Sequence, residues 1–189
     1  MKVLIFLFLI SQDKSILEIL KQKYLKINTF KSFFTQKLFS NDNRLIQTFS
    51  GVIYVKKPNK LLFEVKYPEP QKIISDGDTV WIYFPLKNKL FKKDFSQYNK
   101  HIHPDIFLFN ASKEFKAKTF SLKKFYKVLY IPKVYNPYYD SIAIFVSKVD
   151  TLISSMVVFT SQSYSVYTFK KVKVNLNLPD SLFIFRKGG

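Results

Sequence analysis

The residues best suited to metal chemistry stand close together near the middle of the chain. His101 and His103 are separated by one residue, and Asp105 follows them. Imidazole and carboxylate groups can both bind transition metals. No further ligand stands beside them, and Pro104 interrupts the group at a point where a short helix could begin. We therefore expect no metal site here.

The side chains required for catalysis do not form a set in this sequence. Cysteine is absent, which excludes a thiol nucleophile, a thiolate metal site and a disulfide framework. A hydroxyl nucleophile would have to share the same two histidines, because the chain has no others. Asp76 and Asp78 could form a carboxylate pair, but they flank Gly77, and an Asp-Gly step is typical of a hairpin turn. We expect no enzyme activity and no cofactor.

The formal net charge is +18, and lysine supplies nearly all of the positive charge, since the only arginines are Arg44 and Arg186. Such a charge attracts anionic partners, either nucleic acid or an anionic lipid surface. The lysines are scattered, with no long run of like charges. Lysine, asparagine, isoleucine, phenylalanine and tyrosine are all abundant, as in proteins of AT-rich genomes, so composition alone also accounts for the charge.

The first residues have the pattern of an export signal. Lys2 precedes an apolar run at residues 3–10, and polar residues follow at 11–13. A run of this length suits a signal peptide and is far shorter than the ~20 residues of a membrane span. We expect residues 1–12 to be a signal peptide and residues 13–189 to form one domain.

Residues 14–28 carry apolar side chains at helical spacing, with lysines on the opposite side. The pattern predicts one amphipathic helix that covers another surface of the fold. Its apolar face consists of Ile16, Leu17, Leu20, Tyr24 and Ile27.

From residue 30 onward, the sequence predicts β-strands separated by turn residues and prolines. The expected strands are 30–39, 45–55, 61–67, 73–74, 80–84, 118–120, 126–131, 141–148, 155–160, 164–174 and 182–185. Many short strands with one or two helices predict a mainly β (α+β) fold, with a curved sheet or incomplete barrel and helices on one side.

The alternation within the strands shows which residues share a face. Leu61, Phe63 and Val65 lie on one face of their strand, whereas residues 80–84 are apolar on both faces. A sheet with one face in water does not have this pattern. The sheet is therefore covered on both sides in places, or its concave face encloses a cavity.

Four stretches occur in a recognisable order. Residues 30–36 have the form F-x-x-x-F-T-Q, and residues 51–59 read G-V-I-Y-V-K-K-P-N. Residues 74–85 read I-S-D-G-D-T-V-W-I-Y-F-P, and residues 182–185 read L-F-I-F before a C-terminal glycine. Together they resemble the periplasmic outer-membrane lipoprotein carrier family, LolA, over essentially the whole chain beyond the signal.

The resemblance implies an unclosed antiparallel β half-barrel with a helical lid over a hydrophobic cavity. Proteins of this family hold the acyl chains of lipoproteins, without cofactor or covalent chemistry. The cargo comes from an inner-membrane LolCDE-type transporter and passes to an outer-membrane LolB-type receptor. We therefore expect a monomeric periplasmic carrier that shuttles lipoproteins between the two membranes.

Several residues of this chain take candidate roles from the resemblance, although ordinary core packing would give each of them the same pattern. The candidate acyl-binding wall consists of Phe34, Leu61, Phe63, Val65, Ile73, Trp81 and Tyr83. The candidate inner face of the lid consists of Leu20, Tyr24 and Ile27.

The family also implies a latch for the lid. In the family, an arginine before Pro-Asn hydrogen-bonds carbonyl groups of the helices and helps to hold the lid shut. Lys57 stands at this position and lacks the planar fork of donors. Lys56 could supply part of the latch. The short basic C-terminus lacks the usual proline, which leaves open any role of a longer C-terminal loop.

Two alternatives remain. The chain could carry another amphiphile, such as a glycolipid or phospholipid. It could also be a basic β-barrel that binds nucleic acid by lysines and stacked aromatics. The abundance of phenylalanine, which is usually buried, speaks against the second alternative, and we expect no nucleic acid as partner.

Overall fold

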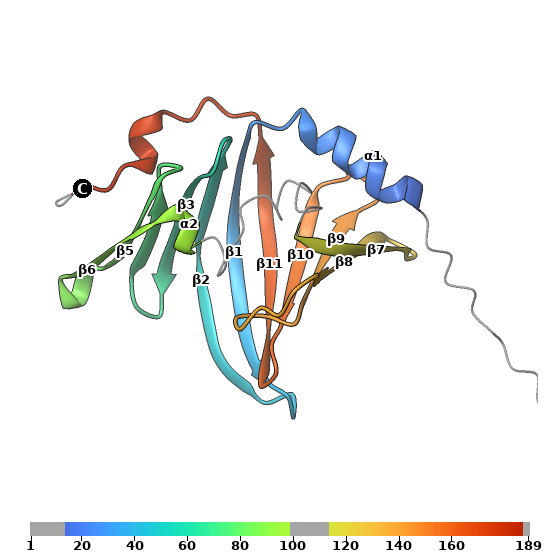
Figure 1. Ribbon diagram of the computed structural model, residues 1–189, viewed down its shortest axis with the longest axis horizontal. Helices are drawn as coiled ribbons and strands as arrows, with labels where there is room; N and C mark the ends of the chain where they lie inside the picture. The colour runs from blue at the N-terminus through green and yellow to red at the C-terminus, as the bar shows by residue number, and fades with distance from the viewer. Residues whose placement is uncertain (1–13, 99–113, 187–189) are drawn as a thin grey trace, which may run out of the picture.

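The computed structural model describes residues 14–98 and 114–186 (Figure 1). The predicted signal peptide and the His101–His103–Asp105 group lie outside these residues. The helices are α1 (Lys14–Leu25), α2 (Phe95–Tyr98) and the 3₁₀ turns η1 (Pro85–Lys87) and η3 (Asp180–Phe183). The strands are β1 (Thr29–Ser40), β2 (Leu45–Lys56), β3 (Lys60–Tyr67), β4 (Gln71–Ser75), β5 (Thr79–Phe84), β6 (Lys89–Asp94), β7 (Phe115–Ser121), β8 (Phe125–Pro132), β9 (Ser141–Ser147), β10 (Ile153–Phe159) and β11 (Ser163–Val174).

The described strands form one antiparallel sheet with the order β6-β5-β4-β3-β2-β1-β11-β10-β9-β8-β7. The long strands β1 and β11 pair in the middle and join the two halves of the sheet. The sheet curves strongly and its two edges, β6 and β7, are not paired with each other. The predicted unclosed antiparallel half-barrel is therefore confirmed.

Most strand predictions match the observed elements to within a few residues, but one prediction fails and one observed strand was not predicted. The strand β6 was not expected, because its sequence, Lys-Leu-Phe-Lys-Lys-Asp, is mostly charged. The strand predicted at residues 182–185 is wrong, since this segment contains the end of η3 and continues as irregular chain. Four apolar residues in a row fit a strand, but here Leu182, Phe183 and Phe185 pack in the outer-face cluster without joining the hydrogen bonds of the sheet, and Ile184 is exposed.

Both faces of the sheet bury apolar side chains, as the alternation indicated. The larger buried cluster, which we call the inner cluster, combines the apolar face of α1 with residues of both halves of the sheet. The smaller, outer cluster lies on the opposite face, where the C-terminal segment with Leu178 and Phe183 packs on Leu62 and Ile74.

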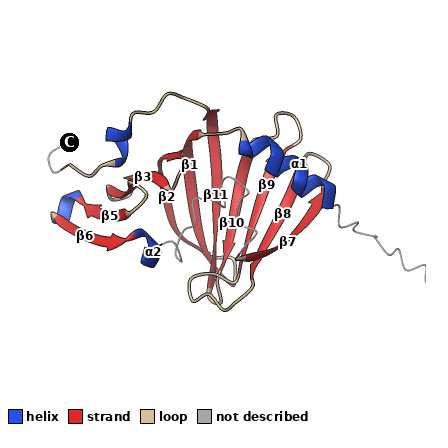
Figure 2. Ribbon diagram, turned by 45° about the horizontal axis from the view of Figure 1, so that its top comes forward, coloured by secondary structure: helices blue, strands red, loops and turns tan. Residues whose placement is uncertain are grey.

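The helix α1 is the inner cover. It crosses the β7–β10 half of the sheet at one end of the strands (Figure 2). Leu25 ends the helix, earlier than the predicted residue 28, but Ile27 is still buried in the inner cluster. Among the described residues, no helix has the length and apolar character needed to cross a membrane.

Candidate ligand-binding site

The register of β3, β4 and β5 builds one wall of the inner cluster. Phe63 lies opposite Ile73, and Ile73 lies opposite Ile82 on the next strand. Residues that face each other across an antiparallel pair point to the same side of the sheet. This row therefore faces inward as a unit. The structure places five of the predicted wall residues in the inner cluster, namely Phe34, Leu61, Phe63, Val65 and Ile73.

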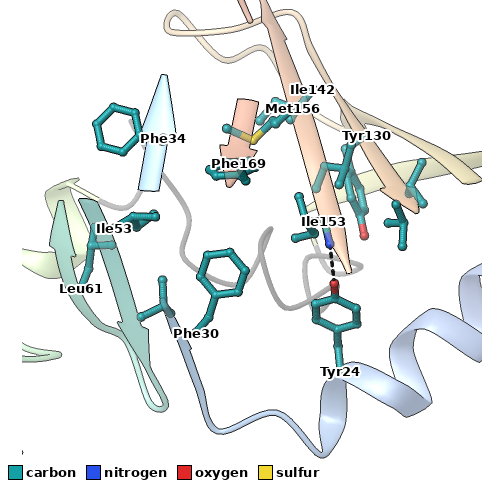
Figure 3. Close-up of a cluster of buried hydrophobic side chains, with 14 of the residues drawn as sticks. Tyr24, Phe30, Phe34, Ile53, Leu61, Tyr130, Ile142, Ile153, Met156 and Phe169 are labelled. Carbon is teal, nitrogen blue, oxygen red and sulfur yellow. Dashed lines mark hydrogen bonds between the residues drawn. The ribbon is translucent and has the colours of Figure 1, made fainter. Parts of the chain in front are cut away.

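Phe34 connects this wall to the middle of the sheet. Its ring stacks on the ring of Phe63, with centroids 4.4 Å apart. Phe34 and Phe169 from the central strands and Ile53 from β2, all labelled in Figure 3, belong to the same inner cluster. The interior surface is therefore continuous from one half of the sheet to the other.

Gly51 makes the close contact under Phe34 possible. A Cβ atom added at this position would lie 1.9 Å from the carbonyl oxygen of Glu64 and 3.0 Å from the ring of Phe34. The pairing of β2 with β3 also shifts by one residue at this point. Only a glycine lets the two backbones and the ring approach so closely.

The placement of Trp81 and Tyr83 on the inner wall is wrong. Trp81 lies opposite Ile74 and packs on the outer cluster, and the Tyr83 ring lies 5.2 Å from that of Phe185. Both face the C-terminal segment on the outside of the sheet. The inward residues of β5 are instead Val80 and Ile82. Because both faces of this strand are apolar, its alternation does not show which face is inward, and the pairing of Ile82 with Ile73 on β4 decides it.

The predicted lid residues Leu20, Tyr24 and Ile27 all lie in the inner cluster, with at most 3% of each exposed. Leu20 and Tyr24 are four residues apart and so lie on the same side of α1. The Tyr24 hydroxyl accepts a hydrogen bond of 3.0 Å from the backbone N–H of Ile153 at the start of β10 (Figure 3). Burial raises the pKa of this hydroxyl well above its usual value.

Polar contacts fix the C-terminal end of α1. Lys23 donates to the carbonyl oxygen of Asp150 and to the hydroxyl of Thr151, in the turn between β9 and β10. Asn175 accepts a bond of 2.8 Å from the N–H of Asn28 and donates one of 3.1 Å to the carbonyl of Lys26. The apolar face of the helix thus covers the interior, and the polar links gather at one end.

Lys57 adds the link that the family resemblance implied. Its Nζ donates hydrogen bonds of 3.0 Å to the carbonyl oxygen of Tyr24 and 3.1 Å to that of Leu25. The last carbonyls of a helix have no partner within the helix and carry the negative end of its dipole, which favours a cation. A single ammonium group therefore holds the end of α1 to the turn between β2 and β3.

Lys56 does not share this role. Its Nζ donates to the carbonyl oxygen of Leu178 at 2.7 Å and forms an ion pair of 2.7 Å with Asp180, on the outer face. Lys60 binds the other carboxylate oxygen of Asp180 at 2.9 Å. Hydrogen bonds from Lys56 and Lys60 lower the pKa of Asp180 to about 2. The same turn thus binds α1 on one side and the C-terminal segment on the other.

A pocket with a volume of about 770 Å³ opens beside the inner cluster. Phe115 and Tyr139, which are both buried in that cluster, form part of its lining. The exposed residues Val134 and Tyr135 form another part, and Ser96 contributes from α2, which follows the edge strand β6. The volume lies within the roughly 300–1,000 Å³ of ligand pockets.

Within the two described ranges, no group of three or more histidine, aspartate or glutamate side chains is arranged to hold a metal ion. The interior surface contains hydrocarbon and aromatic side chains with a few hydroxyl groups. Burial of such side chains removes apolar surface from water.

The fold and this interior define a class of protein, the half-barrels with a helix laid over an apolar concave face. The chain matches the family described as outer membrane lipoprotein carrier protein LolA over residues 25–186. It belongs to that family.

Curated relatives agree with this placement. The chain is 35% identical to an outer-membrane lipoprotein carrier protein of Shewanella pealeana over 78 residues, which are 41% of this chain and 38% of the relative. It is 34% identical to one of Yersinia pestis over 67 residues, which are 35% of this chain and 33% of the relative. The aligned parts thus span about two fifths of these relatives or less.

A LolA superfamily protein from Nitrosomonas europaea superposes with a TM-score of 0.54 at 13% identity, covering 93% of this chain and 98% of that one. An uncharacterised protein from Thermus thermophilus superposes with a TM-score of 0.57 at 11% identity, covering 92% and 94%. At these identities, the likeness establishes the fold alone.

Proposed function

We propose that this chain is a periplasmic carrier of lipoproteins. It holds the acyl chains of its cargo between the inner face of the sheet and α1, and it performs no catalysis. The cargo comes from an inner-membrane transporter of the LolCDE type and passes to an outer-membrane receptor of the LolB type. The carrier acts as a monomer. The observation that carries the proposal is an apolar interior covered by α1, a helix that a few hydrogen bonds hold at its C-terminal end.

The energy of acyl burial explains why such a cover is needed. Each buried methylene is worth about 0.8 kcal/mol, so a chain of about a dozen methylenes gains on the order of 10 kcal/mol in a membrane. A carrier must supply a similar gain and still release the chain. Contacts that close the empty interior compete with the ligand and lower its net affinity. The inner face of α1, with Leu20 and Tyr24 buried in the cluster, makes contacts of this kind.

The pocket beside Phe115 and Tyr139 is the proposed point of entry. It leads from exposed residues to side chains of the inner cluster, and both Phe115 of the edge strand β7 and Ser96 of α2 line it. A ligand that enters here would displace α1 from the interior while its polar part stays at the surface.

Native mass spectrometry tests the proposal. The purified chain is mixed with a diacylated lipopeptide, with the same peptide without acyl chains, and with a phospholipid. We expect a complex with the lipopeptide and none with the bare peptide. A complex with the phospholipid that excludes the lipopeptide would show a carrier for a different amphiphile. Binding of neither acylated molecule would refute the carrier function.

A further inference from the structure

The inner cluster contains two deeply buried tyrosines whose hydroxyl groups differ in one respect. Tyr24 is 0% exposed and Tyr130 is 1% exposed. The Tyr24 hydroxyl has the N–H of Ile153 as a hydrogen-bond donor. The Tyr130 hydroxyl is buried and has no hydrogen-bond partner in the part of the chain that the structure describes.

An unpaired buried hydroxyl is costly in an apolar interior. The great majority of buried polar side-chain atoms have a hydrogen-bond partner. A buried group without one loses its hydrogen bonds to water and gains none in the protein. A phenylalanine would fill the same place without this cost. Burial raises the pKa of Tyr130 above its usual value, so the phenol keeps its proton and remains a donor.

The position of Tyr130 suggests which group could accept this proton. Its side chain projects from β8 into the inner cluster, with the hydroxyl on the side of Ile153 and Tyr24 (Figure 3). The ring lies 5.8 Å from the ring of Phe115, which also lines the pocket. The hydroxyl therefore lies in the region that α1 covers and the pocket approaches.

Movement of α1 would change the balance of donors in this region. When Tyr24 leaves with the helix, the N–H of Ile153 loses the hydroxyl oxygen that it now binds. The interior would then present two donors, this N–H and the Tyr130 hydroxyl, within an apolar wall. A hydrocarbon chain cannot satisfy them, whereas the carbonyl oxygen of an acyl ester or amide can.

We propose that Tyr130 is a ligand-binding residue whose hydroxyl donates a hydrogen bond to an ester or amide carbonyl of the bound acyl group. The interior is thereby selective for acyl-linked lipids over ether-linked or plain hydrocarbon chains of the same length. The inference rests on the proposed function and adds a polar determinant to an apolar site.

Two probes test this selectivity. One is a lipopeptide with two ester-linked acyl chains, and the other is the same peptide with two ether-linked alkyl chains of equal length. We expect the unaltered chain to bind the ester probe more tightly. Tyr130→Phe should weaken ester binding about five- to tenfold, which corresponds to one hydrogen bond, and should leave ether binding unchanged.

The stability of the empty protein gives a second readout. Tyr130→Phe removes an unpaired hydroxyl and should leave the melting temperature unchanged or raise it. Tyr24→Phe leaves the N–H of Ile153 without its hydrogen-bond acceptor and should lower the melting temperature. Tyr67→Phe, at a tyrosine that is 59% exposed, should change neither stability nor binding.

The outcomes distinguish a failure of the Tyr130 site from a failure of the proposed carrier function. If the unaltered chain binds neither probe, both the carrier function and the Tyr130 site are refuted. If it binds both probes equally, or if Tyr130→Phe weakens both equally, the site alone is refuted. A melting temperature lowered as much by Tyr130→Phe as by Tyr24→Phe would show that the hydroxyl already has a partner.

Discussion

Replacement of Lys57 by methionine tests how the lid is held. The change keeps an unbranched stem of four heavy atoms and removes the ammonium group that donates to the carbonyls of Tyr24 and Leu25. A hydrogen bond with a charged donor contributes about 1.5–3 kcal/mol when buried. Because Lys57 is only half-buried and water competes for its ammonium group, we assign about 1–2 kcal/mol to both bonds together.

A loss of about 1–2 kcal/mol shifts the ratio of closed to open lid by roughly five- to thirtyfold. If the ligand binds only the open form, its apparent affinity rises as that form becomes more populated. Lys57→Met should therefore tighten binding of an acylated ligand by up to the same factor and slow its transfer to an acceptor. Lys57→Arg keeps two donors and should leave both properties near their original values.

Titration with a fluorescent lipopeptide measures the affinity, and hydrogen exchange of the α1 amides measures lid opening. Lys56→Met is the matched control, since it removes the same charge from the neighbouring residue, whose bonds go to Leu178 and Asp180 on the outer face. Weaker ligand binding by Lys57→Met, or equal effects of the two substitutions, would refute the latch mechanism.

Three further predictions concern the framework of the site. Gly51→Ala should lower the free energy of unfolding by about 3 kcal/mol or more, because its Cβ would lie 1.9 Å from the Glu64 carbonyl oxygen; thermal denaturation that matches the unaltered chain would contradict the close contact. Leu20→Ala should lower the free energy of unfolding, measured by urea titration, by about 2–5 kcal/mol, because the side chain is 1% exposed. An unchanged free energy of unfolding would mean that the helix is not packed in solution. The pKa of Asp180 lies at about 2 instead of 3.8. The contribution of its ion pairs to stability is therefore complete above about pH 4 and is lost as the pH falls through 2, which should release the C-terminal segment. The fluorescence of Trp81, the single tryptophan, should report this release of the C-terminal segment, and Asp180→Asn should show it at neutral pH; identical spectra of the two proteins would argue against the ion pair.

Local sequence patterns were sufficient for much of the fold. The spacing of Leu20, Tyr24 and Ile27 identified the buried face of the helix, because side chains three and four residues apart share one side. Likewise, the alternation of Leu61, Phe63 and Val65 identified residues that lie together. The ordered motifs then indicated the half-barrel and the position of Lys57, since those motifs combine turns, strands and contacts that no single element contains.

Other features depend on residues that are far apart in the sequence. A period of two shows that Trp81 and Tyr83 share a face, but the pairing of β5 with β4 decides that this face is the outer one. Lys56 binds the carbonyl oxygen of Leu178 and Lys57 binds that of Tyr24, because segments from the two ends of the chain pack on one turn.

The sequence by itself therefore determined most of the elements, the buried face of the helix and the family, because these depend on local geometry and on short motifs. The tertiary structure decided which face each side chain joins and which polar groups find a partner. The Tyr130 hydroxyl belongs to this second kind, since a buried donor is unpaired only with respect to everything packed around it. Hydrogen-bond satisfaction is a property of the assembled interior, and no local pattern encodes it.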